Sequence, residues 1–260
     1  MLKPNTQARN QFEEEGYVNF HGVLDAELIK EASDHVDWLL GKHPELRGEQ
    51  LHHNLMEHDA FWVRLISDDR MLDIVEQFIG PDIALFASHY ISKPPFTGQA
   101  VLWHQDGAYW PLEPMEVVTL WLAIDRADAE NGCMRVIPGT HKQSLIEMQP
   151  ASQADVVLPL ETPAAFVDES MAVDIVLNPG DVEVHHPNII HGSHANESPR
   201  RRCGLTIRYI PTSTRVITNV KWPSLFHLRG NTIPGINDYR PIPRYVPGVS
   251  FPFRDSRRYS

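Results

Sequence analysis

The chain has 260 residues, 42% of them hydrophobic, and a formal net charge of −11. This length and composition suit one large domain with a sizeable core, so a single domain over 1–260 is predicted. The negative charge argues against partners bound through nucleic-acid phosphates or anionic membranes, and no apolar run approaches a membrane span. With only two cysteines and no signal peptide, a reduced, cytoplasmic setting is expected.

The first part of the chain, about 1–80, is predicted to be mainly helical. A short helix is expected to end near Gly16. Asp25 can cap a second helix whose apolar residues are spaced along one face. Asp68 or Asp69 can cap a third, which stops at Gly80. Between these helices, a strand is expected over 17–20 and a polar loop over 51–58.

From about residue 82 to 210 the pattern changes to short strands separated by turn residues, which favours a β-sandwich or jelly roll. The segment 144–170 lacks a clear period and is predicted to be an insertion over the mouth of the barrel. The prolines of 211–260 predict an extended or wrapped tail rather than more sheet. The expected strands are 83–91, 100–105, 117–124, 133–137, 173–177, 182–186, 189–193 and 203–210.

The most informative motif is the pair His104 and Asp106, followed far downstream by His191. Two residues that are two apart on a strand point to the same face. Two histidines and one carboxylate are the donor set of many non-haem Fe(II) oxygenases. Arg202 lies eleven residues after His191, and its guanidinium can hold a carboxylate by two parallel hydrogen bonds. The simplest ligand that needs both a metal and this arginine is a 2-oxo dicarboxylic acid.

Several nearby residues compete for these roles. An ordinary hydrogen bond between His104 and Asp106 is the alternative to a metal site, and the downstream residues decide against it. His191 is preferred for its spacing to Arg202, which leads directly into an apolar strand. Arg208 either lines the same cavity or lies at an edge. The competitors, expected to be surface or supporting residues, are His185, His186, His194, Arg200 and Arg201.

The motifs, taken in order, resemble the phytanoyl-CoA dioxygenase family of Fe(II)/2-oxoglutarate-dependent oxygenases. The similarity runs from about residue 12 to residue 209 and then fades. The matching pieces are Lys93-Pro94-Pro95, His104-Gln105-Asp106, Tyr109-Trp110-Pro111, Trp121, Glu130-Asn131-Gly132-Cys133, 136–142 (VIPGTHK), Pro179-Gly180-Asp181, and His191-Gly192-Ser193 with Asn196, Ser198 and Arg202.

The resemblance implies a double-stranded β-helix with helices packed on one sheet. It also implies that His104, Asp106 and His191 hold iron. The implied contacts to 2-oxoglutarate come from Arg202, Ser193, Trp121 and His89. A tryptophan packed in the core is the rival interpretation of Trp121. Related halogenases have glycine or alanine in place of the carboxylate, so Asp106 argues against halogenation.

We therefore expect an Fe(II)- and 2-oxoglutarate-dependent dioxygenase that uses O2 to hydroxylate a small organic molecule, releasing succinate and CO2. Desaturation, epimerisation or ring formation at the same site is one alternative, and a non-catalytic, cupin-like metal-binding module is another. Tyr109 and Trp110 directly follow the metal motif and are predicted to line the substrate side of the cavity. Core packing of these two aromatics is the competing interpretation. The residues leave the substrate and the oligomeric state open.

Overall fold

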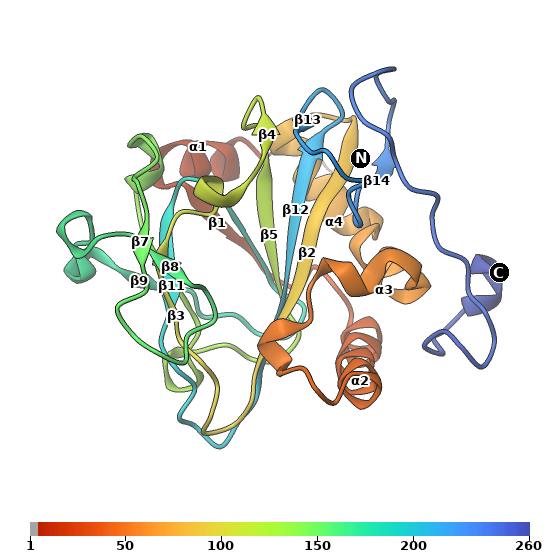
Figure 1. Cartoon of the computed structure of the whole chain (residues 1–260), viewed down its shortest axis with the longest axis horizontal. Helices are drawn as coiled ribbons and strands as arrows, with labels where there is room; N and C mark the ends of the chain where they lie inside the picture. Colours follow the sequence, from red (N-terminus) through yellow and green to blue (C-terminus); the bar gives the residue numbers. More distant parts are fainter. Residues whose placement is uncertain (1–4) are drawn as a thin grey trace.

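The computed structural model describes residues 5–260, and two antiparallel β-sheets form its centre (Figure 1). Each sheet interleaves strands that are far apart in the sequence, as in a double-stranded β-helix. The predicted jelly-roll class is confirmed. In sheet order, the six-stranded sheet contains β1 (Tyr17–Phe20), β10 (Val182–His185), β5 (Val118–Ala123), β12 (Arg202–Pro211), β2 (Ile83–Lys93) and β14 (Phe226–Arg229). The four-stranded sheet contains β3 (Val101–His104), β11 (Ile190–Ser193), β6 (Met134–Ile137) and β9 (Val173–Asp174).

Strand β12 lies at the middle of the larger sheet and determines which side chains share a row. It pairs with β5 on one side and β2 on the other. In this register Thr206 lies opposite both Trp121 and His89. Arg202 lies opposite Lys93, where β2 ends. Because alternate residues of a strand point to the same face, Arg202, Thr206 and Arg208 all project toward the smaller sheet.

Helices cover the outer face of the larger sheet and form the main core with it (Figure 1). As predicted, the carboxylate of Asp25 caps α2 by accepting a hydrogen bond from the Leu28 amide. Asp68, rather than Asp69, caps α4. Gly16 ends α1 with a left-handed backbone (φ 86°), a conformation that glycine adopts without strain. The helices are α1 (Thr6–Glu15), α2 (Ala26–Lys42), α3 (Ala60–Ile66) and α4 (Asp69–Ile79).

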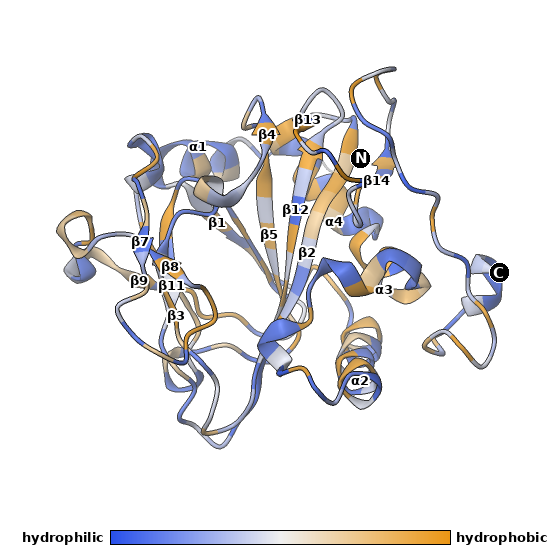
Figure 2. Cartoon of the chain, in the orientation of Figure 1, coloured by the Kyte–Doolittle hydropathy of each residue, from blue (hydrophilic) through white to orange (hydrophobic). Residues whose placement is uncertain are grey.

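The hydropathy of the chain follows these layers. Apolar residues run along β2, β5 and β12 and along α3, whereas α1 is mainly hydrophilic (Figure 2). One buried polar pair lies within the helical core, where His35 Nε2 and Asp59 Oδ2 are 2.8 Å apart. Burial raises the pKa of Asp59, but the charge and hydrogen bond of His35 outweigh it and hold the pKa below its usual value. Within residues 5–260, no helix is both long and apolar enough to cross a membrane.

The sequence-based prediction for the tail was partly wrong. The tail does wrap over the helices, where Phe251 packs against Phe61. It also adds sheet, because β14 pairs with β2 at the edge of the larger sheet. The remaining short strands form two pairs, β4 (Leu112–Glu113) with β13 (Arg215–Val216) and β7 (Gln149–Pro150) with β8 (Leu160–Glu161). The segment predicted as a loop at 51–58 contains the 3₁₀ helix η2 (His53–His58).

Candidate active site

The three predicted metal ligands come from two adjacent strands of the smaller sheet and from the segment that follows one of them. His104 ends β3 and lies directly opposite His191 of β11. Asp106 was expected to share a strand with His104, but it begins the 3₁₀ helix η3 (Asp106–Tyr109). The backbone between them at Gln105 is still extended (φ −115°, ψ 119°), so His104 and Asp106 nevertheless project to the same side. The potential ligand atoms of the three residues all lie within 4.8 Å of one another.

Hydrogen bonds orient both histidines for metal binding. The Nδ1 atom of His104 lies 2.8 Å from the Leu102 carbonyl, and that of His191 lies 3.1 Å from the Ile189 carbonyl. Because a carbonyl oxygen only accepts, each Nδ1 carries the proton and each Nε2 keeps its lone pair for a metal. Burial also lowers the pKa of His191 well below its usual value, which keeps the ring neutral.

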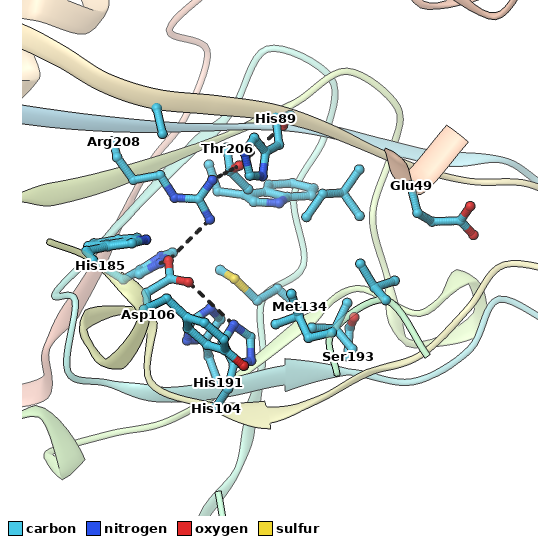
Figure 3. A pocket seen from close by; sticks show the side chains of 18 of the residues that line it. Glu49, His89, His104, Asp106, Met134, His185, His191, Ser193, Thr206 and Arg208 are labelled. Carbon is cyan, nitrogen blue, oxygen red and sulfur yellow. Dashed lines mark hydrogen bonds and ion pairs between the residues drawn. The ribbon is translucent and has the colours of Figure 1, made fainter. Parts of the chain in front are cut away.

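The carboxylate of Asp106 is ionised because of its neighbours. Burial raises the pKa of Asp106, but the positive charge of Arg208 and the nearby histidines outweigh this effect and hold the pKa well below its usual value. Arg208 Nη2 lies 3.3 Å from Asp106 Oδ2, and His104 Nε2 lies 3.5 Å from Asp106 Oδ1 (Figure 3). Two histidine Nε2 atoms and one carboxylate therefore converge here, which fits an iron site.

A buried ion pair behind the carboxylate was missed by sequence reasoning. His185 Nε2 lies 3.9 Å from Asp106 Oδ2, and His185 Nδ1 lies 2.8 Å from Glu183 Oε2. Burial lowers the pKa of His185, but Glu183 and Asp106 outweigh it and raise the pKa to about 9. Glu183 and His185 are two apart on β10, the same spacing as His104 and Asp106, and this was the available signal. His185 is therefore a buried residue of the cavity, whereas His194 is exposed, as expected for a competitor.

Three of the four predicted co-substrate residues, Arg202, Ser193 and Trp121, lie together in the cavity. The Arg202 side chain is buried, and its Nε donates to the Gly132 carbonyl at 3.0 Å. Its guanidinium lies 5.5 Å from the centre of the Trp121 ring and 3.4 Å from Ser193 Oγ. Gly204 makes room for this arrangement, because a Cβ there would overlap the Trp121 indole. Burial lowers the pKa of Arg202 to about 10, which still leaves it charged at neutral pH.

The other two arginines of the run point elsewhere. Arg200 pairs with Asp128 and Glu130, and Arg201 pairs with Asp125 and Asp37. Of the three, only Arg202 lines the cavity.

One cavity of about 310 Å³ joins the metal ligands to the co-substrate residues. Arg208 and His185 lie at one end beside Asp106, and Ser193 and Glu49 lie at the other (Figure 3). Of the two positions considered for Arg208, the structure has the one in the cavity wall rather than the one at an edge. Other lining residues are His89, Tyr109, Trp110, Trp222 and His53.

The segment 144–170 contributes only part of the cavity wall. Val157 and Leu158 line the cavity. The hydroxyl of Tyr109 donates to the Leu160 carbonyl at 3.1 Å, which ties the segment to the loop after the metal motif. Gln105 is absent from the cavity wall; its side chain donates to the Asn188 carbonyl and accepts from the Ile146 amide, which is a structural role.

Comparison with known proteins agrees with this geometry. The sequence model of the family described as Phytanoyl-CoA dioxygenase (PhyH) matches residues 12–204. The chain belongs to the PhyH family. It is 32% identical over 166 residues to the peroxisomal phytanoyl-CoA dioxygenase of Bos taurus, covering 62% of this chain and 49% of that protein. It is 30% identical over 149 residues to a probable alpha-ketoglutarate-dependent hypophosphite dioxygenase of Stutzerimonas stutzeri, covering 56% of this chain and 51% of that protein. The chain thus spans about half the length of these curated relatives.

Solved structures of similar fold include the apo form of the non-heme monooxygenase ThoJ, which matches with a TM-score of 0.75 and 22% identity. The match covers 90% of this chain and 87% of that one. Another is EctD from S. alaskensis with bound Fe, with a TM-score of 0.67, 19% identity, and coverage of 88% of each chain. The description of this family and the buried His-Asp-His set are both compatible with iron as the metal and 2-oxoglutarate as the co-substrate.

Proposed function

We propose that this PhyH-family chain is an Fe(II)- and 2-oxoglutarate-dependent hydroxylase of a small organic molecule. The observation that carries the proposal is one cavity with a metal donor set and a buried arginine. His104, Asp106 and His191 converge beside this cavity, and Arg202 lies further along it. A site that only stored a metal would have no use for that arginine.

The three side chains would hold the metal through His104 Nε2, His191 Nε2 and one oxygen of Asp106, which leaves positions open for other ligands. When bound there, the metal would supply the oxidative chemistry that couples the decarboxylation of 2-oxoglutarate, to succinate and CO2, to oxidation of the substrate by O2. Arg208 holds the Asp106 carboxylate by a hydrogen bond. This bond fixes the orientation of the carboxylate and keeps it ionised without a metal.

The co-substrate would lie between the metal and Arg202. The two N–H groups of a guanidinium match the two oxygens of a carboxylate, so Arg202 would bind the distal carboxylate of 2-oxoglutarate. Ser193 would donate a further hydrogen bond, and the Trp121 indole would pack against the carbon chain. His89 shares the row of Trp121 and would face the same molecule.

The substrate would enter beside the aromatic residues that follow the metal motif. Tyr109 and Trp110 line the cavity on that side, together with Val157 and Leu158. The cavity volume of about 310 Å³ must hold the co-substrate and the reacting part of the substrate. This volume lies at the lower end of the range for ligand sites, which favours a small molecule. The apolar walls would also exclude water during the reaction.

Other oxidative outcomes use the same residues. One similar fold is described as the epimerase SnoN in complex with Fe3+, alpha ketoglutarate and nogalamycin RO. Another is described as the carbocyclase SnoK. Product mass separates hydroxylation, which adds one oxygen, from epimerisation, which leaves the mass unchanged, and from desaturation and oxidative ring formation, which both remove two hydrogens.

The proposal is tested by screening a metabolite library with the full chain and Fe(II), measuring succinate formation. We expect 2-oxoglutarate-dependent succinate that rises with particular library members. His104→Ala and Asp106→Ala should fold but lose nearly all turnover, because two ligands hold iron loosely. His194→Ala is the matched control, since this exposed histidine is close to His191 in the sequence, and it should keep wild-type turnover. Wild-type turnover in either ligand variant with added Fe(II), or none in the wild type, would refute the proposal.

A further inference from the structure

A lysine is buried beside the proposed co-substrate site without an acidic partner. Lys93 ends β2, and its side chain has no exposed area. Its Nζ atom lies 2.7 Å from Ser193 Oγ and also donates to the His194 carbonyl. Within residues 5–260, its ammonium group forms no ion pair with a carboxylate. Burying a cation in this way is costly unless a counter-charge is present, so the position needs an explanation.

Arg202 is a second buried cation of the same kind. Lys93 and Arg202 are direct partners in the β2–β12 register, and both reach the Ser193 hydroxyl, at 2.7 and 3.4 Å. Glu49 is an acidic side chain that lines this end of the cavity (Figure 3). Its carboxylate is already bonded to Arg47, at 3.3 Å, and to the Gln99 amide, at 2.9 Å. This end of the cavity therefore carries an excess of positive charge.

The hydrogen-bond inventory determines where the Ser193 proton points. In its ammonium form Lys93 can only donate, as can the Arg202 guanidinium, so Ser193 Oγ then accepts from both residues and uses both of its lone pairs. The hydroxyl group can then act only as a donor. In the part of the chain that the structure describes, no acceptor receives it. Ser193 lines the cavity, so its O–H is available to a ligand there.

We propose that Lys93 is a positioning residue for the distal carboxylate of 2-oxoglutarate. It orients the Ser193 hydroxyl toward that carboxylate and, with Arg202, supplies the charge that selects a dicarboxylic over a monocarboxylic 2-oxo acid. The inference rests on the proposed function and adds a specificity determinant to it. Burial and Arg202 lower the pKa of Lys93 well below its usual value. A carboxylate bound nearby would stabilise the ammonium form, so ligand and lysine would support each other.

The test compares the binding of two 2-oxo acids by calorimetry, with Mn(II) in place of iron and without oxygen. 2-Oxoglutarate and 2-oxobutyrate share the groups that chelate a metal, but only 2-oxoglutarate has a distal carboxylate. The wild type should prefer 2-oxoglutarate by at least about 30-fold, because a buried carboxylate pair is worth about 2 kcal/mol or more. Lys93→Met should reduce that preference about tenfold and leave 2-oxobutyrate binding unchanged. The exposed Lys142→Met is the control and should keep the full preference.

A double-mutant cycle tests the route through the serine. If Lys93 acts by orienting Ser193, the Lys93→Met and Ser193→Ala effects on 2-oxoglutarate affinity will not add. If Lys93→Met does not fold, Lys93→Gln removes the charge while keeping an N–H donor and is measured in the same way.

Each remaining outcome separates the two proposals. A wild type with no preference for 2-oxoglutarate would refute the co-substrate site itself. A wild type that discriminates, with full discrimination kept in the Lys93 variants, would overturn the Lys93 inference and leave the proposed function standing. Equal weakening of both 2-oxo acids would show a general structural role for Lys93 and would also overturn the inference.

Discussion

Replacing Arg202 by lysine tests the proposed co-substrate anchor most directly. The substitution keeps a positive charge but removes the planar group that can bind both oxygens of a carboxylate. In the structure, Arg202 is 2% exposed, donates to the Gly132 carbonyl and lies against the Trp121 ring. A lysine ammonium would lose the parallel pair of hydrogen bonds and could not remain bonded to Gly132 in the same pose.

The expected magnitude follows from this burial. Disrupting a buried, hydrogen-bonded charge pair costs about 2–5 kcal/mol, and a retained charge favours the lower end of that range. About 2 kcal/mol corresponds to a rise of about 30-fold in the dissociation constant for the co-substrate, since 1.4 kcal/mol is tenfold. Arg202→Met removes the charge as well and should therefore weaken binding further.

The same arginine run supplies matched controls. Arg200 and Arg201 form their ion pairs away from the cavity, so Arg200→Lys and Arg201→Lys should leave the dissociation constant for the co-substrate within about twofold of the wild-type value. The assay is calorimetric titration of the Mn(II)-loaded chain with 2-oxoglutarate, and the Michaelis constant for the same co-substrate is measured in parallel on the iron form. Equal weakening in all three variants would mean that the run acts only as a basic surface, and the reasoning would be refuted.

Three further predictions concern the substrate side, the cavity wall and the core. Tyr109→Phe or Trp110→Leu should change the substrate KM or the product position while leaving the free energy of unfolding within about 1–2 kcal/mol of the wild-type value. A large drop in Tm with unchanged kinetics would mean that these two aromatic residues belong to the core instead. Gly204→Ala should displace the Trp121 indole, cost about 1–3 kcal/mol of stability and weaken 2-oxoglutarate binding measured by calorimetry. Gly41→Ala is the control; an added Cβ there meets nothing within 4 Å, so binding should be unchanged. Asp59→Asn should lower the free energy of unfolding by about 1–3 kcal/mol at neutral pH. Because the folded-state pKa of Asp59 is lowered, the difference between wild type and variant should be full above about pH 4 and should shrink as the pH falls. Urea unfolding measured across this pH range checks the prediction.

Local sequence signals predicted the elements that depend on local physics. The caps at Asp25 and Gly16 determine where α2 begins and α1 ends, because they satisfy backbone groups only a few residues away. Alternating apolar residues marked the long strands β2 and β12 to within a few residues of their observed ends. The tail strand β14 was missed, because its partner β2 lies far away in the sequence and the prolines around it argued against a strand.

The sequence by itself predicted His104, Asp106 and His191 as a metal donor set and singled out Arg202, because their residue types and spacing indicate one recognisable chemistry. Only the tertiary structure decided what surrounds them. Arg208 reaches Asp106 across the barrel, and Lys93 reaches Ser193 between the two sheets. One contact joins β12 to the 3₁₀ helix that follows β3, and the other joins β2 to β11; no spacing rule connects these segments. Their energies come from burial and from the orientation of hydrogen bonds, which exist only once both sheets have formed.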